Sequence, residues 1–481
     1  MVKSLAILAI PAKLIPVTFG PVFRREPGPE RIVSIFRSAC FGKGGVMRQT
    51  LVGNLVFMTL VVLIGVKEVR AEETRKIPLI VPGTEFVAIE SHRSDRGGFN
   101  DFCVFEDDNQ LWHLFAISTH RPSDPAFRYP SFLHATSNAF TGTWERQPYV
   151  DLGKMHNWAP WIIRDPLRPS ICIMFVGGSK EETLRTYESE ADDLFYWKLR
   201  KDLGKKHGTR DAIVRLDEND QQYYLYATMG SPANGNEGIA VSVSADMDNW
   251  KTIRVIPTGP ANTCDESPFV VAHDGWYYLW ATVSSIHYYR GIQTRIFCSK
   301  HPDFRDLPDT RAENALYTIP MHAIEIVELD EQTWIGRTGH QGPGIVFSRL
   351  RWGAYGTTRQ LARDELSCEG EWMWTNRGAC SQPGASFECR FTGGRVEWRG
   401  NISPSGGKAD IYIDGKLAGL ADQYGYDRRA FSNEYRGAFI WTSEDMPDGE
   451  HVFRVVLRDD KNPASRGTLI TVTQVTVTEF R

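Results

Sequence analysis

The chain has 481 residues, of which 42% are hydrophobic and 24% are charged, and its formal net charge is −4. This length predicts two or three globular domains. The small net charge gives no reason to expect nucleic acid or an anionic membrane surface as a partner. The 14 Trp and 17 Tyr residues fit either a packed core or surfaces on which sugar rings stack.

The N-terminal region has the pattern of an export signal. Met47 precedes an apolar run from Leu51 to Val66, and Val69-Arg70-Ala71 then places small residues at the −3 and −1 positions. Residues 47–71 are therefore predicted to be a signal peptide, which makes the mature protein secreted or periplasmic and free of the membrane. The run is short for a membrane span of ~20 residues, although an uncleaved anchor is the alternative. Residues 1–46 are then an upstream extension or a long leader.

The cysteines do not form a disulfide framework, because seven follow Ala71 and they are thinly spread. Cys368, Cys380 and Cys389 cluster, so one bridge among them is open to an exported protein. No His or Cys spacing suggests a structural zinc site.

A strand-turn-strand unit recurs about every 53 to 57 residues along the mature chain. Each unit has a polar residue, a short apolar strand, an acidic or Pro-rich turn and an aromatic strand. A weaker fifth unit is expected to start near Thr338. This period is that of a propeller blade with insertions, so an all-β, five-bladed β-propeller is predicted over residues 78–355. The four clear units start at Asp101, Trp158, Arg210 and Cys264.

The fourth unit shows the pattern best. Glu266 stands before the apolar strand 269–272, Asp274-Gly275 favours a tight hairpin turn, and the strand 276–282 is rich in aromatics. Strand alternation predicts that Asp265 points away from Glu266.

The pattern changes after about Arg359, where alternating strands and the turns Asp414-Gly415 and Asp448-Gly449 predict a β-sandwich over residues 360–481. This domain either binds carbohydrate or packs on the propeller as a structural element. The expected strands are 385–391, 395–399, 409–413, 451–457 and 468–478.

Three acids stand at the starts of predicted inner strands, namely Asp101, Asp211 and Glu266. Inner strands line the axis of a propeller, so these acids should converge at one end of it. Glycoside hydrolysis needs a pair of carboxyl groups, and a third nearby can raise the pKa of the acid. The alternative for any one of them is a solvated strand end, which we expect for the acids of the hairpin turns: Asp107, Asp108, Asp217, Glu218, Asp220 and Asp274.

Residues about 80 to 350 resemble the five-bladed propeller glycoside hydrolases, the group that contains families 43, 32, 62, 68 and 117. Two features depart from the usual motifs: Ser267 stands where family 43 usually has Gly, and Phe102 follows Asp101 where Pro is usual. The motifs that carry the resemblance are Asn100-Asp101, Trp158-Ala159-Pro160, Arg210-Asp211 and Glu266-Ser267-Pro268.

The resemblance implies catalytic roles for the three acids. Glu266 would be the general acid, and Asp101 the base of an inverting enzyme or the nucleophile of a retaining one. Asp211 would contact substrate hydroxyls or modulate a pKa. A carboxyl separation of ~5 to 5.5 Å gives retention and ~6.5 to 9.5 Å inversion. The Trp-Ala-Pro element favours inversion.

Further residues are candidates for substrate binding, each with a structural alternative. Arg210 holds a sugar hydroxyl or forms an ion pair, and Trp158 or Trp161 stacks on a sugar or packs in the core. Asn100 belongs to the first-blade motif. The resemblance places His340 near the axis, where it would help to bind a structural calcium ion or waters. No cofactor is predicted to be required.

The sequence therefore predicts an exported glycoside hydrolase that acts on a plant- or algal-type oligosaccharide or polysaccharide, with arabinosyl, xylosyl or fructosyl linkages favoured. The alternatives are a non-catalytic carbohydrate-binding propeller and a protein-binding propeller. Only the last has no need for the three carboxyl groups to converge.

Overall fold

The computed structural model describes residues 75–90, 99–118, 132–153, 157–178, 183–231, 235–257, 263–285, 293–329, 332–338, 344–425 and 435–480. The predicted signal peptide and His340 lie outside these residues. The helices of the described ranges are two short 3-10 turns, η1 (Ala312–Asn314) and η2 (Arg363–Glu365). Neither is long or apolar enough to cross a membrane.

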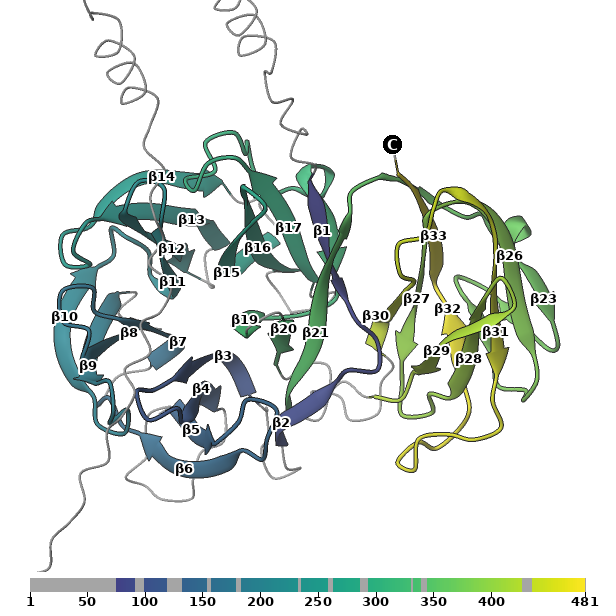
Figure 1. Cartoon of the computed structure of the whole chain (residues 1–481), viewed down its shortest axis with the longest axis horizontal. Coiled ribbons are helices and arrows are strands. Elements are labelled where there is room, and N and C mark those ends of the chain that lie inside the picture. Colours follow the sequence, from purple (N-terminus) through teal and green to yellow (C-terminus); the bar gives the residue numbers. More distant parts are fainter. Residues whose placement is uncertain are drawn as a thin grey trace, which may run out of the picture. The chain divides into compact units, whose positions relative to one another are not determined.

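Five antiparallel sheets surround a common axis, so the predicted five-bladed propeller is confirmed (Figure 1). The inner strands of successive blades contact one another, and the fifth contacts the first, which closes the ring. The first blade contains β3 (Phe99–Glu106), β4 (Trp112–Ser118), β5 (Phe132–Ser137) and β6 (Glu145–Val150), and the second contains β7 (Asn157–Arg164), β8 (Ile171–Gly178), β9 (Leu184–Glu190) and β10 (Lys198–Gly204). The third blade contains β11 (Arg210–Asp217), β12 (Gln222–Ser231), β13 (Gly235–Ser244) and β14 (Lys251–Pro257). The fourth contains β15 (Thr263–His273), β16 (Trp276–Ser285), β17 (Gln293–Ser299) and β18 (Tyr317–Ile319).

The fifth blade joins the two ends of the propeller. It contains β19 (Glu325–Leu329), β20 (Gln332–Arg337) and β21 (Gly344–Ala354), and its outer edge is supplied by β1 (Lys76–Ile80) and β2 (Phe86–Glu90). Strand β1 pairs with the C-terminal half of β21, and β2 pairs with its N-terminal half.

The prediction that the fifth unit starts near Thr338 was wrong. The inner strand of this blade is β19, and Thr338 follows the second strand, β20. A Gly-rich stretch is typical of a connection between strands, and this one lies in the sequence between the second and third strands of the blade rather than before the first.

Large apolar side chains fill the space between neighbouring blades. Tyr226 and Ile239 of the third blade belong to the same buried cluster as Trp280 and Phe297 of the fourth. Each fully buried side chain of this size contributes about 1.5–3 kcal/mol to the stability of the propeller. The packed blades thus hold the inner strands rigidly around the axis.

A β-sandwich follows the propeller, as predicted. Its core contains Phe387, Trp398 and Phe453, which are fully buried. Its strands are β22 (Thr357–Gln360), β33 (Gln474–Glu479), β27 (Arg395–Ile402) and β30 (Tyr435–Thr442) in one sheet; β23 (Ser367–Glu369), β26 (Ser386–Gly393), β31 (Gly449–Leu457), β28 (Lys408–Ile413) and β29 (Lys416–Asp422) in the other; and β24 (Met373–Trp374), β25 (Gly378–Cys380) and β32 (Ile470–Val472) in a small third sheet.

The disulfide left open for this domain is absent, since Cys368, Cys380 and Cys389 are all free thiols. Cys380 and Cys389 are buried in the apolar core, where a thiol packs as a small hydrophobic group.

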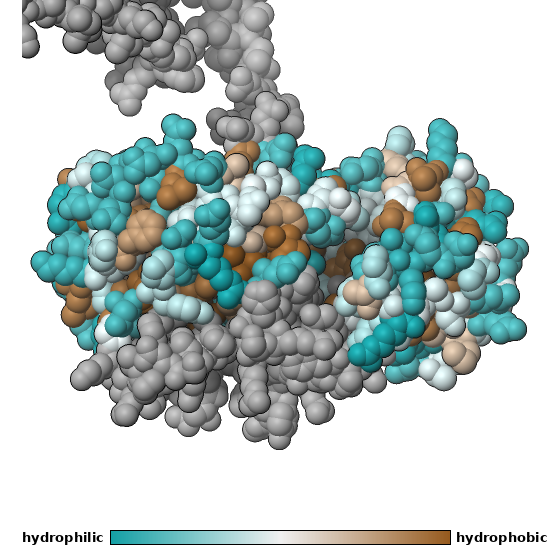
Figure 2. Space-filling model, turned by 90° about the horizontal axis from the view of Figure 1, so that it is seen from below, coloured by the Kyte–Doolittle hydropathy of each residue, from teal (hydrophilic) through white to brown (hydrophobic). Residues whose placement is uncertain are grey.

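Hydrogen bonds connect the sandwich with the propeller, which fits the structural alternative for this domain. Arg395 donates to the carbonyl of Ala354 at 2.9 Å, and Arg399 donates to that of Thr318 at 2.8 Å. On the face shown in Figure 2, hydrophilic residues cover most of the visible surface and hydrophobic residues occupy several separate places.

Candidate active site

The inner strands carry a β-bulge at their N-terminal ends. The pairing shifts between Trp158 and Trp161 in the second blade, between Arg210 and Ile213 in the third, and between Glu266 and Phe269 in the fourth. A bulge inserts one extra residue and re-aims the side chains around it. In three blades a residue at this position has a left-handed backbone, which costs a residue with a β-carbon roughly 1–2 kcal/mol. These residues are Ala159 (φ 47°), Asp211 (φ 54°) and Ser267 (φ 49°), and Ala323 (φ 45°), two residues before β19 in the fifth blade, has the same conformation.

The bulges correct one sequence expectation. Asp101 and Asp211 lie at the bulge itself, whereas Glu266 stands one residue before it. The three acids therefore do not share one repeat position. The bulge brings two adjacent residues to the axis. The fourth blade has its acid, Glu266, at the first of these positions, and the third blade has its acid, Asp211, at the second.

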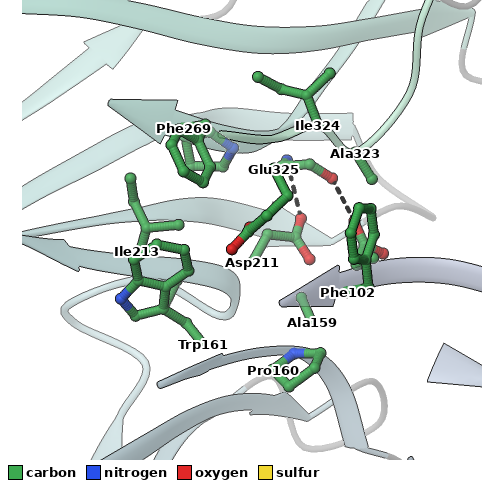
Figure 3. A pocket seen from close by; sticks show the side chains of 14 residues that line it. Phe102, Ala159, Pro160, Trp161, Asp211, Ile213, Phe269, Ala323, Ile324 and Glu325 are labelled. Atoms are coloured by element: carbon green, nitrogen blue, oxygen red, sulfur yellow. Dashed lines mark hydrogen bonds between the residues drawn. The ribbon is translucent and has the colours of Figure 1, made fainter. Parts of the chain in front are cut away.

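The three acids nevertheless belong to one cluster, and Ser267 connects them. Its hydroxyl donates to Oδ1 of Asp101 at 2.7 Å, and its backbone N–H donates to Oδ2 of Asp211 at 3.2 Å. Thr228 also donates to Oδ2 of Asp211, at 2.8 Å. Figure 3 shows Asp211 and the hydrogen bonds beside it at the axis.

Two basic side chains complete the cluster. Arg210 lies with Nη2 3.2 Å from Oε2 of Glu266 and Nε 3.3 Å from Oδ2 of Asp211, and it donates to the carbonyl of Gly230 at 2.9 Å. His322 lies with Nε2 3.6 Å from Oε1 of Glu266. Both are at least 97% buried. Arg210 thus forms the ion pair that was one of its two expected roles.

His322 was missed by the sequence analysis, although a signal for it exists. It stands three residues before Glu325, the first residue of β19, just as Glu266 stands three residues before the apolar run 269–272 of β15. The 53-to-57-residue period, continued from Glu266, points to residues 319–323. Continuing the period rather than following the Gly-rich stretch would have found His322.

Burial and the neighbouring charges shift the pKa values of these groups in opposite directions. Burial raises the pKa of Asp211 to about 7, against the effect of Arg210. Burial also raises the pKa of Asp101, although the charge of His322 opposes it. Burial alone would raise the pKa of Glu266, but His322 and Arg210 together lower it. Burial alone would lower the pKa of His322, but Glu266 and Asp101 raise it.

The basic and acidic groups of the cluster therefore oppose one another. The raised pKa of His322 favours its imidazolium form, which together with Arg210 offsets part of the charge of the three carboxyl groups. In a buried site an uncompensated charge is unfavourable, and the raised pKa values of Asp101 and Asp211 favour the protonated forms of these two acids. A site that holds both an ionised and a protonated carboxyl group can perform acid–base chemistry.

The other predicted residues have mainly structural contacts. Asn100 donates to Oδ2 of Asp101 at 3.0 Å and so orients that carboxylate. The indole N–H of Trp161 donates to the carbonyl of Val214 at 3.1 Å, and its ring packs edge-to-face on Phe269, which matches the core-packing alternative. Trp158 is half-buried and packs against the hydrophobic core between the first and second blades.

Asp265 points away from the cluster, as strand alternation predicts. Its carboxylate accepts a hydrogen bond from Thr310, whereas that of the adjacent Glu266 contacts Arg210 and His322. The structure therefore places Glu266, and not Asp265, in the cluster.

A calcium site is not supported by the described part of the chain. His340 lies outside it, and within it no group of three or more His, Cys, Asp or Glu residues is arranged to hold a metal ion.

A fourth carboxyl group, that of Glu325, lies inside the propeller axis. It lines a small cavity of about 30 Å³ together with Asp101 and Asp211, and this cavity is large enough for a water molecule, which needs ~10–15 Å³. Figure 3 shows Glu325 near Phe102, Trp161, Ile213 and Phe269, which line the same cavity from the other four blades. Burial raises the pKa of Glu325 well above its usual range, which favours the protonated form of this carboxyl group.

Replacing Glu325 with leucine (E325L) should stabilise the protein, because it gives the fifth blade the apolar residue that the others have. We expect a gain of about 1–3 kcal/mol at pH 8, the usual cost of a poorly paired buried polar group. A raised folded-state pKa means that the native protein binds a proton that the unfolded chain loses above its own pKa of 4.5. The wild type should therefore lose stability relative to E325L as the pH rises from 4.5. Urea unfolding at pH 5 and pH 8 measures this, and an equal difference at both pH values would contradict it.

The chain has similarity to solved structures at low sequence identity. No family model matches the chain, and no curated protein matches it in sequence. It is similar to the exo-β-1,3-galactanase of Phanerochaete chrysosporium bound to galactose, with 11% identity, a TM-score of 0.44 and coverage of 83% of this chain and 100% of that one. It is also similar to the fructofuranosidase of Schwanniomyces occidentalis bound to fructose, with 12% identity, a TM-score of 0.45 and coverage of 82% of this chain and 97% of that one. The exo-inulinase of Aspergillus awamori is similar at 13% identity, with a TM-score of 0.44 and coverage of 81% of this chain and 96% of that one.

Proposed function

We propose that the protein is a glycoside hydrolase whose catalytic groups are Asp101, Asp211 and Glu266. The observation that carries the proposal is the gathering of these three carboxyl groups with Arg210 and His322 at the axis, from strands far apart in sequence. A purely structural axis would be filled by apolar side chains. Hydrolysis of a glycosidic bond requires a protonated and an ionised carboxyl group at one site, and here burial raises the pKa of Asp101 and Asp211 while His322 and Arg210 lower that of Glu266.

In this proposal the proton for the leaving oxygen comes from Glu266 together with His322. The pKa of Glu266 is lowered and that of His322 is raised, so the proton of this pair is favoured on the imidazole, and its transfer to Glu266 requires the two side chains to close from 3.6 Å to hydrogen-bond distance. Asp101 acts from the other side as general base or nucleophile. Asp211, whose pKa is raised to about 7, is partly protonated at neutral pH and so limits the repulsion that Asp101 and Glu266 experience.

We further propose an exported enzyme that acts on arabinosyl, xylosyl or fructosyl linkages of plant- or algal-type glycans. Export rests on the sequence pattern of residues 47–71, and N-terminal sequencing of the secreted protein would test it by locating the cleavage site after Ala71. The substrate class rests on the motif resemblance of residues about 80 to 350.

The direct test is turnover on a panel of aryl glycosides and oligosaccharides with the mature chain. We expect release of a monosaccharide or short oligosaccharide from at least one pentosyl or fructosyl substrate. Proton NMR of the first-formed anomer then distinguishes inversion from retention. No turnover on the panel, combined with measurable sugar binding by calorimetry, would overturn hydrolysis in favour of a carbohydrate-binding propeller.

A further inference from the structure

Ser267 has a side chain where the backbone would favour glycine. Its φ of 49° lies in the left-handed region, which residues with a β-carbon rarely adopt. At the equivalent bulge position, Ala159 has no polar side-chain atom, whereas Ser267, like Asp211, has a polar side chain that is hydrogen-bonded. The side chain is therefore kept at a position that disfavours it, and such positions often have a functional role.

Ser267 donates hydrogen bonds to both of the proposed catalytic acids other than Glu266. The hydroxyl donates to Asp101, which is 166 residues away in the sequence, and the backbone N–H donates to Asp211, which is 56 residues away. Glu266 is the preceding residue of the chain. Since Ser267 is only 9% exposed, water does not readily replace these contacts. One residue thus connects three blades at the site.

We propose that Ser267 is a positioning residue, which holds Asp101 through its hydroxyl and Asp211 through its backbone N–H in fixed places beside Glu266. The inference rests on the proposed function for its catalytic consequence, but the contact with Asp101 can be tested without turnover. A hydroxyl that donates to a carboxylate stabilises its charged form. The bond from Ser267 accordingly lowers the pKa of Asp101, against burial and the charge of Glu266, which raise it.

Two variants separate the effect of the hydroxyl group from the effect of the left-handed backbone. S267A removes the hydroxyl and keeps the β-carbon, whereas S267G removes both and relieves the left-handed backbone, so S267G is the variant least at risk of misfolding. A159G is the matched control, because it relieves the same backbone conformation in the second blade without touching the partner of Asp101. Thermal unfolding reports that each variant is folded.

The first readout is the carbon-13 titration of the Asp101 carboxyl group in protein labelled at aspartate, assigned by its loss in D101N. We expect the midpoint to move to higher pH in S267A and S267G and to stay in place in A159G. An unchanged midpoint in both folded Ser267 variants would overturn the proposal.

The second readout is the pH dependence of kcat/KM. Asp101 must be ionised to act as base, so the acidic limb should move to higher pH in both Ser267 variants, with activity recovering as the pH rises. A uniform loss of activity with unmoved limbs would overturn the positioning role. If the wild type hydrolyses nothing, the proposed function fails, and the titration alone still decides whether Ser267 holds Asp101.

Discussion

Replacing Glu266 with glutamine (E266Q) or Asp101 with asparagine (D101N) should lower kcat by ~10²–10⁴-fold, the usual contribution of a positioned acid or base. Each amide has the shape of the acid it replaces but cannot deliver or accept the proton. The amide introduced by D101N would still accept the hydroxyl of Ser267, and the amide introduced by E266Q would still fit between Arg210 and His322. The fold should therefore be retained. Steady-state kinetics and thermal unfolding of both variants measure this.

The matched control is D220N. Asp220 lies in the exposed hairpin turn of the third blade, at the opposite end of β11 from Asp211, where it accepts the hydroxyl of Tyr224 at 2.7 Å. Its kcat should equal that of the wild type. Full hydrolysis by both E266Q and D101N would remove the two acids from the mechanism.

Replacing Arg210 with methionine (R210M) should have the largest effect on stability. The change leaves Glu266 and Asp211 buried beside one fewer positive charge, and breaking a buried ion pair from one side costs about 3–5 kcal/mol. Activity should also fall, because the balance of charge in the cluster is lost.

The destabilisation by R210M should depend on pH. Arg210 helps to lower the folded-state pKa of Glu266, so this pairing stabilises the protein above the unfolded-state pKa of 4.5 and stops doing so as the pH falls through the lower folded-state value. The free energy of unfolding lost in R210M should therefore be large at pH 7 and shrink below pH 4.5. R254M is the control, since Arg254 donates to the carbonyl of Leu307 at 2.7 Å, and its effect should vary little with pH. Urea unfolding of the wild type and R210M across pH 3.5–7 measures this difference. A loss of unfolding free energy in R210M that is the same at every pH would contradict the charge argument.

The sequence was sufficient to predict the propeller and the gathering of the three acids, because both follow from the repeat. A periodic unit places its equivalent residues on one ring of the fold, whatever the loops between them do. The exact register was not predictable in the same way. The extra residue of each bulge breaks the two-residue alternation, so Glu266 and Asp211 reach the axis from adjacent positions.

Two further residues show what local patterns leave out. Trp161 follows Trp158 by three positions across a bulge, so alternation cannot say which ring faces the core, and the contacts with Val214 and Phe269 decide it. Glu325 reads in sequence as an ordinary polar residue at a strand end. Its burial becomes apparent only when the equivalent residues of the other four blades surround it.

The closure of the ring between β1 and β21 also sets the order of events during synthesis. Residues 76–80 leave the ribosome before the other strands of the propeller, but their pairing partners lie at 350–354. At ~5–20 residues per second, the first strand waits roughly 15–55 seconds for its neighbour. Until then four blades can form while the edges that β21 will cover stay open to other chains. The propeller therefore becomes complete in a single late step, and the interval before β21 emerges is when a nascent chain is most exposed to misassembly.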